Sequence, residues 1–156
     1  MDKAINAIKE FSGVEHRLEF VREINGVKWY NDSVSSSPTR TIAGLNSYDE
    51  DIVLIAGGYD KNLDYSPIAK PILNKVTKLI LFGATSNKIY DAVMQEKKDE
   101  NIIIYKEKTL EDVVNRAKEV AVANEVVLFS PASASFDMFK NFADRGIQFK
   151  NLVNKL

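Results

Sequence analysis

The chain has 156 residues, which is enough for one domain with a substantial hydrophobic core. Apolar residues make up 45% and charged residues 28%, and the formal net charge of −1 gives no general attraction to nucleic acid or to an anionic membrane surface. The lack of cysteine and the single histidine, His16, exclude a disulfide framework and a thiolate or multi-histidine metal site. The apolar runs are far shorter than the ~20 residues of a membrane-spanning helix, and the polar start is not a secretory signal, so we expect a cytoplasmic protein with no membrane partner.

A hairpin is predicted first, because apolar runs at residues 18–24 and 27–30 flank the turn dipeptide Asn25-Gly26. Short apolar strands then alternate with helices, several of which start at a serine or threonine that suits a helix cap. The predicted strands cover residues 52–56, 79–82, 102–105 and 126–129, and the predicted helices cover 37–45, 66–74, 86–97, 109–123, 136–143 and 147–155.

This pattern predicts a doubly wound α/β domain. Strands that are apolar throughout, each followed by a helix, are typical of a parallel sheet with helices on both faces, and the hairpin adds an antiparallel strand. We therefore expect a mostly parallel, Rossmann-like sheet without internal repeats. Ligands bind such sheets at the carboxyl ends of the strands. The loops that we expect to meet there are residues 31–37, 57–64, 83–86 and 130–135.

The chemistry of these loops indicates an anion pocket. The three serines between Ser130 and Ser135 precede a predicted helix start, where free N–H groups and the helix dipole favour anions. Lys61 follows two glycines in another loop; a lone lysine in a turn is usually solvated, but beside hydroxyl groups it suits a carboxylate. Asp32 and Ser36 lie in the first loop. No GxxxxGK[ST], GxSxG or GxGxxG motif is present, so the residues supply no obvious nucleophile, base or metal cage.

The aromatic residues could belong either to the core or to a ligand-binding surface. Phe136, Phe139 and Phe142 share helical spacing, which favours a place in the core, and Trp29 is expected there too.

Four motifs together resemble the C-terminal domain of the bacterial Mur ligases. They read VEHRLEFV, NGVKWYNDS followed by SP, VLIAGGYDKNLDY and LFSPASASFDMFKNFADRG. The resemblance is closest to the branch that adds D-glutamate to UDP-N-acetylmuramoyl-L-alanine in peptidoglycan synthesis. It implies that residues 14–156 form the amino-acid-binding domain and that residues 1–13 are a linker or helix from a central domain.

The resemblance also implies an ATP-dependent amide ligation through an acyl phosphate. Family members have three domains, and the central one holds most of the ATP and Mg²⁺ site. We therefore expect this chain to be a C-terminal domain without the other two, inactive alone and without catalytic residues or metal ligands of its own.

Residue by residue, the resemblance implies two sets of contacts. The residues expected to bind D-glutamate are Lys61, Ser135, Ser36 and Phe142, the last through its backbone with its ring packed inward. The residues expected at the nucleotide are Arg17, Asp32 (toward the ribose) and His16.

One position departs from the family pattern. Val34 stands where a lysine is common, so either another base, with Arg40 the nearest candidate, takes its place or the lysine is dispensable. Two alternatives remain open for the whole chain. One is the C-terminal domain of a folylpolyglutamate-synthase-like ligase, and the other is a stand-alone doubly wound binding or regulatory module.

Overall fold

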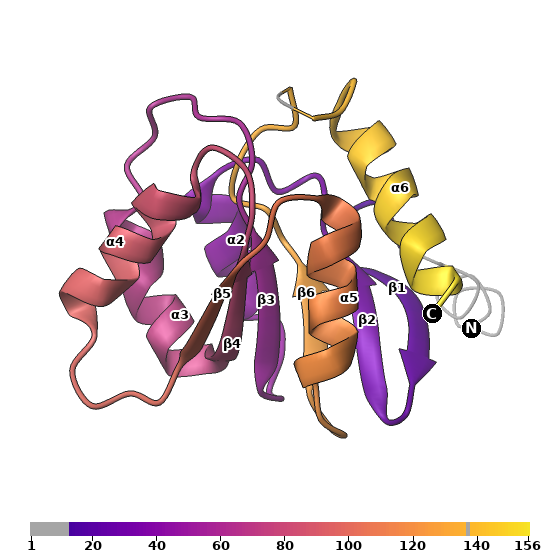
Figure 1. Ribbon diagram of the computed structural model, residues 1–156, viewed down its shortest axis with the longest axis horizontal. Helices are drawn as coiled ribbons and strands as arrows, with labels where there is room; N and C mark the ends of the chain where they lie inside the picture. Colours follow the sequence, from indigo (N-terminus) through magenta and orange to yellow (C-terminus); the bar gives the residue numbers. More distant parts are fainter. Residues whose placement is uncertain (1–12, 137) are drawn as a thin grey trace, which may run out of the picture.

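The fold is an α/β sandwich, seen in a computed structural model that describes residues 13–136 and 138–156. Within these residues, six strands form one sheet in the order β1-β2-β6-β3-β4-β5 (Figure 1). The strands are β1 (Glu19–Ile24), β2 (Val27–Asn31), β3 (Ile52–Ala56), β4 (Val76–Leu81), β5 (Ile103–Lys106) and β6 (Val126–Phe129). β1 pairs antiparallel with β2, and every other pairing is parallel. The predicted fold class is therefore confirmed.

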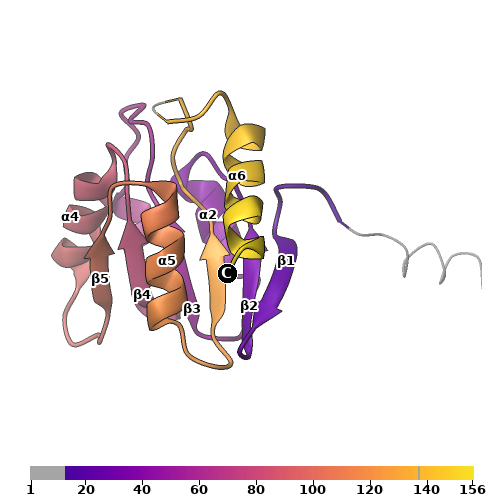
Figure 2. The same ribbon diagram turned by 45° about the vertical axis from the view of Figure 1, so that its right-hand side comes forward.

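Helices cover both faces of the sheet, as Figure 2 shows. One face carries α2 (Pro38–Leu45), the short 3-10 helix η1 (Ser66–Ile68), α3 (Ala69–Lys75) and α4 (Ser86–Glu96). The other face carries α5 (Leu110–Val120) and α6 (Phe142–Asn154).

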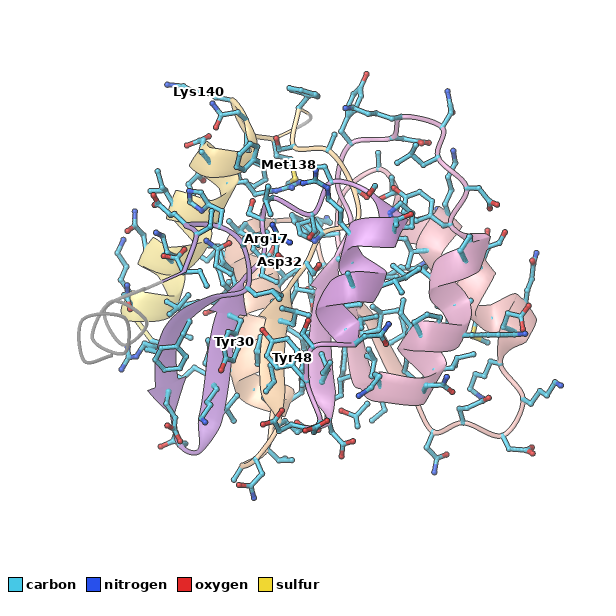
Figure 3. All side chains as sticks on the ribbon, turned by 180° about the vertical axis from the view of Figure 1, so that it is seen from behind. Arg17, Tyr30, Asp32, Tyr48, Met138 and Lys140 are labelled. Carbon is cyan, nitrogen blue, oxygen red and sulfur yellow. The ribbon has the colours of Figure 1, made fainter. Side chains whose placement is uncertain are left out.

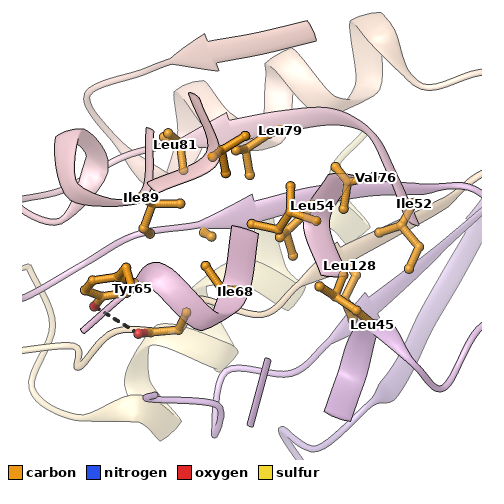
Figure 4. Packing of buried hydrophobic residues seen from close by; sticks show 14 of the residues in the cluster. Leu45, Ile52, Leu54, Tyr65, Ile68, Val76, Leu79, Leu81, Ile89 and Leu128 are labelled. Carbon is orange, nitrogen blue, oxygen red and sulfur yellow. Dashed lines mark hydrogen bonds between the residues drawn. The ribbon is translucent and has the colours of Figure 1, made fainter. Parts of the chain in front are cut away.

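Alternate side chains of each strand enter two separate cores, which explains why the strands are apolar throughout. On β3, Leu54 points into the core under α2, α3 and α4, whereas Val53 and Ile55 point into the core under α5 and α6. Figure 4 shows the first of these cores. Trp29 is 1% exposed and belongs to the second core, as expected.

The segment before α6 differs from the prediction. Residues 136 and 138–141 form turns and bends instead of a helix, and α6 begins only at Phe142. The cause is Asn141, whose side-chain oxygen accepts a hydrogen bond from the N–H of Asp144 (2.8 Å) and so caps the helix there. The core prediction is therefore wrong for Phe136, which is 61% exposed, and for Phe142, which is 41% exposed, whereas Phe139 packs partly buried against the second core.

The expected helix caps are only partly present. Thr109 and Asp112 form the predicted capping box at α5. Ser37 precedes α2 as predicted, but its hydroxyl makes no capping hydrogen bond. The predicted linker, residues 1–13, lies outside the described residues except for Gly13. No helix in the described part of the chain is long and apolar enough to cross a membrane.

Candidate functional site

The four loops predicted to share the carboxyl edge of the sheet are joined by hydrogen bonds. We call residues 31–37 the aspartate loop, residues 57–64 the glycine loop and residues 130–141 the serine loop. Main-chain bonds connect them to one another and to the loop after β4: Asp32 N–H to Phe129 C=O (2.8 Å), Gly57 N–H to Pro131 C=O (2.8 Å), Tyr59 N–H to Ala134 C=O (2.8 Å) and Thr85 N–H to Gly58 C=O (3.1 Å).

The two glycines of the glycine loop are required by this close backbone packing. Both have positive φ values, +120° at Gly57 and +156° at Gly58, which residues with a Cβ atom rarely adopt. A Cβ atom at Gly57 would overlap the carbonyl oxygen of Phe82, and one at Gly58 would lie 2.5 Å from the carbonyl oxygen of Ala134. The glycines therefore admit neighbouring main chain, which the sequence alone did not reveal.

A buried chain of hydroxyl groups ties three of the loops together. The hydroxyl of Tyr65 donates to the carbonyl of Ala132 (3.0 Å), so it must accept from Ser133 Oγ (2.8 Å). Ser133 in turn accepts from Thr85 Oγ1 (2.8 Å), which accepts from the N–H of Gly58 (3.0 Å). All donors in the chain point one way, an arrangement in which each bond strengthens the next.

This series of hydrogen-bonded hydroxyl groups shows which serines of the serine loop have a structural role. Ser133 is committed to it, and Ser130 donates to a carboxylate oxygen of Asp32 (2.7 Å), so both hydroxyl groups are structural. Ser135 is 3% exposed, and its hydroxyl makes no hydrogen bond with the described residues. The prediction of serines at a helix start is wrong, because α6 begins seven residues after Ser135. Among these three serines, Ser135 is the one whose hydroxyl has no hydrogen-bond partner within the described residues.

Lys61 of the glycine loop contacts the serine loop through the ring of Phe136. The ammonium group of Lys61 lies 5.2 Å from the centre of the Phe136 ring, the residue next to Ser135, and makes a cation–π contact. The edge of the Tyr59 ring packs on the same phenyl group at 6.0 Å between centroids. The fold thus brings the loops of two predicted D-glutamate contacts, Lys61 and Ser135, to one place.

An ion pair holds the base of the glycine loop. Asp60 pairs with Lys88 of α4 (2.7 Å) and accepts a hydrogen bond from the N–H of Asn62 (2.8 Å). The Lys88 bond, with the Asn62 bond second, lowers the pKa of Asp60. Lys61 therefore projects from a loop fixed on both sides.

A separate cavity of about 290 Å³ opens beside the aspartate loop, and Arg17, Asp32, Val34 and Arg40 are among its lining residues. Asp32 is 2% exposed. One of its oxygens accepts from the N–H of Leu18 (3.1 Å), and the other accepts from the hydroxyl of Ser35 (2.6 Å) as well as from Ser130. Burial raises the pKa of Asp32, and these hydrogen bonds offset only part of that effect. Arg17 and Asp32 lie side by side in Figure 3.

Arg145 of α6 links the aspartate and serine loops, a role that the sequence did not suggest. Its guanidinium donates to Ser33 Oγ (3.0 Å), to the carbonyl of Ser33 (2.6 Å) and to the carbonyl of Ser133 (2.8 Å), and the side chain is 1% exposed. Ser33 Oγ donates onward to the carbonyl of Phe142 (2.7 Å). The Phe142 backbone is therefore fixed, whereas its ring is exposed and not packed inward as expected.

His16 does not line the Asp32 cavity. It lies between Asn31 and α6, with the edge of its ring toward Phe142 (6.1 Å) and with Gly146 so close that a Cβ atom there would overlap the imidazole. The oxygen of the Asn31 side chain accepts from Ser33, so its nitrogen donates to His16 Nδ1 (2.9 Å). With Nδ1 accepting this bond, the other ring nitrogen, Nε2, faces Oε1 of Glu15 at 3.4 Å.

The predicted site residues thus fall into two groups on one edge of the sheet. Lys61 and Ser135 belong to the joined glycine and serine loops, and Arg17 and Asp32 belong to the cavity. Ser36 is partly buried and its hydroxyl reaches only the carbonyl of Val34 (3.4 Å). No group of three or more histidine, cysteine or carboxylate side chains within residues 13–136 and 138–156 is placed to hold a metal ion.

Fold and geometry together define an α/β domain in which a lysine-bearing loop and a serine loop meet at one edge of the sheet, next to a cavity lined by two arginines and an aspartate. Residues 16–133 match the family described as "Mur ligase, glutamate ligase domain", and the chain belongs to this family. The resemblance seen in the four motifs is therefore confirmed.

Curated relatives are closely similar over nearly the whole chain. UDP-N-acetylmuramoylalanine--D-glutamate ligase of Clostridium novyi (strain NT) is 53% identical over 148 residues, covering 94% of this chain and 32% of the relative. The ligase of the same name from Acetivibrio thermocellus is 53% identical over 150 residues, covering 94% and 32%. The chain spans about a third of the length of these relatives.

Solved structures share the fold at low sequence identity. UDP-N-acetylmuramate-alanine ligase MurC from Thermotoga maritima has a TM-score of 0.64 at 17% identity, covering 96% of this chain and 32% of that one. A bifunctional folylpolyglutamate synthase/dihydrofolate synthase from Yersinia pestis has a TM-score of 0.66 at 14% identity, covering 97% and 34%. At such identities these likenesses establish the fold only.

Proposed function

We propose that this chain is the C-terminal domain of an ATP-dependent ligase that adds D-glutamate to UDP-N-acetylmuramoyl-L-alanine in peptidoglycan precursor synthesis. The observation that carries the proposal is the 53% identity, over 94% of the chain, to a relative named for that reaction. In this role the domain positions D-glutamate and closes over ATP. The placement of Lys61 beside the serine loop supports it, because a dicarboxylate needs a cation and hydroxyl donors together.

The residues of the joined loops would orient the amino acid. Lys61 pairs with one carboxylate of D-glutamate, and the hydroxyl of Ser135 donates to a carboxylate oxygen. The Phe142 backbone, fixed by Ser33, borders the ligand, and Ser36 supplies a further hydroxyl. These contacts hold the amine in place for attack, so their contribution is proximity and electrostatics. None of these groups is a nucleophile or base, so we propose that the chain alone has no ligase activity.

The cavity around Asp32 would receive part of the nucleotide. Arg17 offers a cation to phosphate, and the lone pairs of Asp32 that remain can accept a ribose hydroxyl. As the resemblance implies, ATP and Mg²⁺ would be held mainly by the domain outside this chain. His16 would not contact the nucleotide itself but would hold the segment that carries Arg17 against α6.

An NMR titration of this chain with D-glutamate and with L-glutamate tests the proposal. We expect D-glutamate to shift the amide signals of Lys61 and of the serine loop, and Lys61→Ala to remove these shifts. Lys118→Ala, an exposed lysine on α5, is the matched control and should leave them unchanged. A preference for L-glutamate would favour a folylpolyglutamate-synthase-like ligase. Shifts that avoid both loops would favour a stand-alone module, and either result would contradict the proposal.

A further inference from the structure

Two arginines from different elements line the Asp32 cavity. Arg17 comes from the segment before β1, and Arg40 comes from the first turn of α2. Both side chains are exposed, and neither makes a hydrogen bond or ion pair with the described residues. Asp32 is the one acidic side chain among the described lining residues, and both its oxygens already accept hydrogen bonds. Two unpaired guanidinium groups facing one satisfied carboxylate suit a ligand with several negative charges.

The position of Arg40 is unfavourable for the helix that carries it. The N-terminal turn of a helix is its positive end, where acidic side chains stabilise and cations destabilise. α2 has no acidic residue in this turn, and Ser37 makes no capping hydrogen bond that would satisfy its free N–H groups. Among the described residues, Arg40 also has no carboxylate partner that would explain its position. A cation at the positive end of a helix lowers stability, so an arginine there without a compensating contact is a candidate for ligand binding.

Val34 adds an independent reason, because it lines the same cavity. By the resemblance of the motifs, a lysine is common at this position, whereas Val34 presents an apolar side chain. Arg40 lines the same cavity from α2 and supplies a positive charge, which Val34 does not. An arginine suits this task, since its planar fork donates two parallel hydrogen bonds to a phosphate group.

We propose that Arg40 binds the phosphate chain of the nucleotide together with Arg17, and that it replaces the cation absent at position 34. The naming of the ligand as a nucleotide rests on the proposed function, whereas the charge of the cavity alone requires a polyanion. A phosphate chain is favoured over a carboxylate because it presents several charged oxygens to both guanidinium groups at once.

NMR titrations of the chain with ADP, inorganic tripolyphosphate and adenosine test this proposal, with Arg40→Ala as the central variant. We expect Arg40→Ala to weaken ADP and tripolyphosphate by about tenfold, the loss typical of one charge-assisted hydrogen bond in a partly solvated site, and to leave adenosine unchanged. Adding Val34→Lys to Arg40→Ala should recover most of the affinity. Lys118→Ala removes the same charge far from the cavity and should have no effect. Arg40→Ala should also raise the urea midpoint slightly, because a cation leaves the positive end of α2.

Several results would overturn the inference. Equal affinity of the wild-type chain and Arg40→Ala for ADP would remove Arg40 from the site, and so would an equal loss in Lys118→Ala, which would indicate a general field effect. Failure of Val34→Lys to recover affinity would contradict the replacement. If D-glutamate shifts the amide signals of Lys61 and the serine loop but ADP and tripolyphosphate shift no signal near Arg40, this inference is contradicted and the proposed function is not. The converse result, phosphate binding without any response to D-glutamate, would contradict the proposed function alone.

Discussion

Removing one hydroxyl group from the buried chain should cost this domain a large share of its stability. Tyr65→Phe deletes that group and leaves the ring, which packs in the first core near Ile68 (Figure 4). The carbonyl of Ala132, fully buried, then loses its donor. Ser133 loses its acceptor too, and because Thr85 Oγ1 already donates to it (2.8 Å), turning the Ser133 hydrogen toward Thr85 would only reverse that bond.

The expected loss follows from what remains unsatisfied. An orphaned buried carbonyl costs ~1–3 kcal/mol, and the lost Ser133 bond adds about 1 kcal/mol. We expect a total loss of about 2–4 kcal/mol, a substantial part of the ~5–15 kcal/mol by which domains are stable. The loss should also loosen the glycine and serine loops relative to each other.

Urea unfolding provides the assay. The midpoint of Tyr65→Phe should fall while the slope stays the same, because the surface exposed on unfolding does not change. Tyr59→Phe is the matched control, since Tyr59 is 42% exposed and its hydroxyl makes no hydrogen bond with the described residues. A loss below ~1 kcal/mol, or one equal to that of Tyr59→Phe, would refute the ordered hydroxyl chain.

Three further substitutions probe other contacts. In the full-length ligase, Lys61→Ala should weaken D-glutamate by about 1.5–3 kcal/mol and ATP much less, and an unchanged KM and kcat for D-glutamate would exclude Lys61 from the site. Gly146→Ala should lower the thermal midpoint by displacing His16, and His16→Ala in the same chain should relieve the clash; a midpoint like that of the wild type would contradict this packing. Lys78→Met removes both hydrogen bonds of 2.9 Å to Glu125 and should cost about 2–3 kcal/mol at neutral pH. Burial alone would raise the pKa of Glu125, but the bonds to its carboxylate, chiefly that from Lys78, keep it below 4.5 in the folded chain. Its stabilisation is therefore present above 4.5 and is lost as the pH falls through the folded pKa, so the gap between variant and wild type should narrow in acid; a gap independent of pH would count against the pair.

The sequence predicts the sheet well, because its strands are under a strict constraint. A run such as Ile52–Ala56 must be covered on both faces, and both its predicted limits match β3. The predicted helix over residues 136–143 is wrong because aromatic spacing matched a helix, whereas the cap at Asn141 decided where α6 starts.

The site was harder to predict than the fold. Lys61 stands out, since a cation after two glycines at a strand end has few local explanations. The serines could not be told apart, because the partners of Ser130 and Ser133 are 98 and 68 residues away in the chain. Arg145 gave no signal of its own, since an arginine in a helix is normally solvated and its burial depends on loops that only the folded chain brings together.

The position of β6 between β2 and β3 has a consequence for the geometry of the two proposed ligand sites. The cavity lies at the end of β2 and the glycine loop at the end of β3, so two strand spacings, together ~10 Å, separate the sites. The main-chain hydrogen bonds of the sheet thus fix the spacing between the two sites. Side-chain substitutions can change how tightly each ligand is held, but the distance between them is set by the backbone and would change only if the ladder itself were rebuilt.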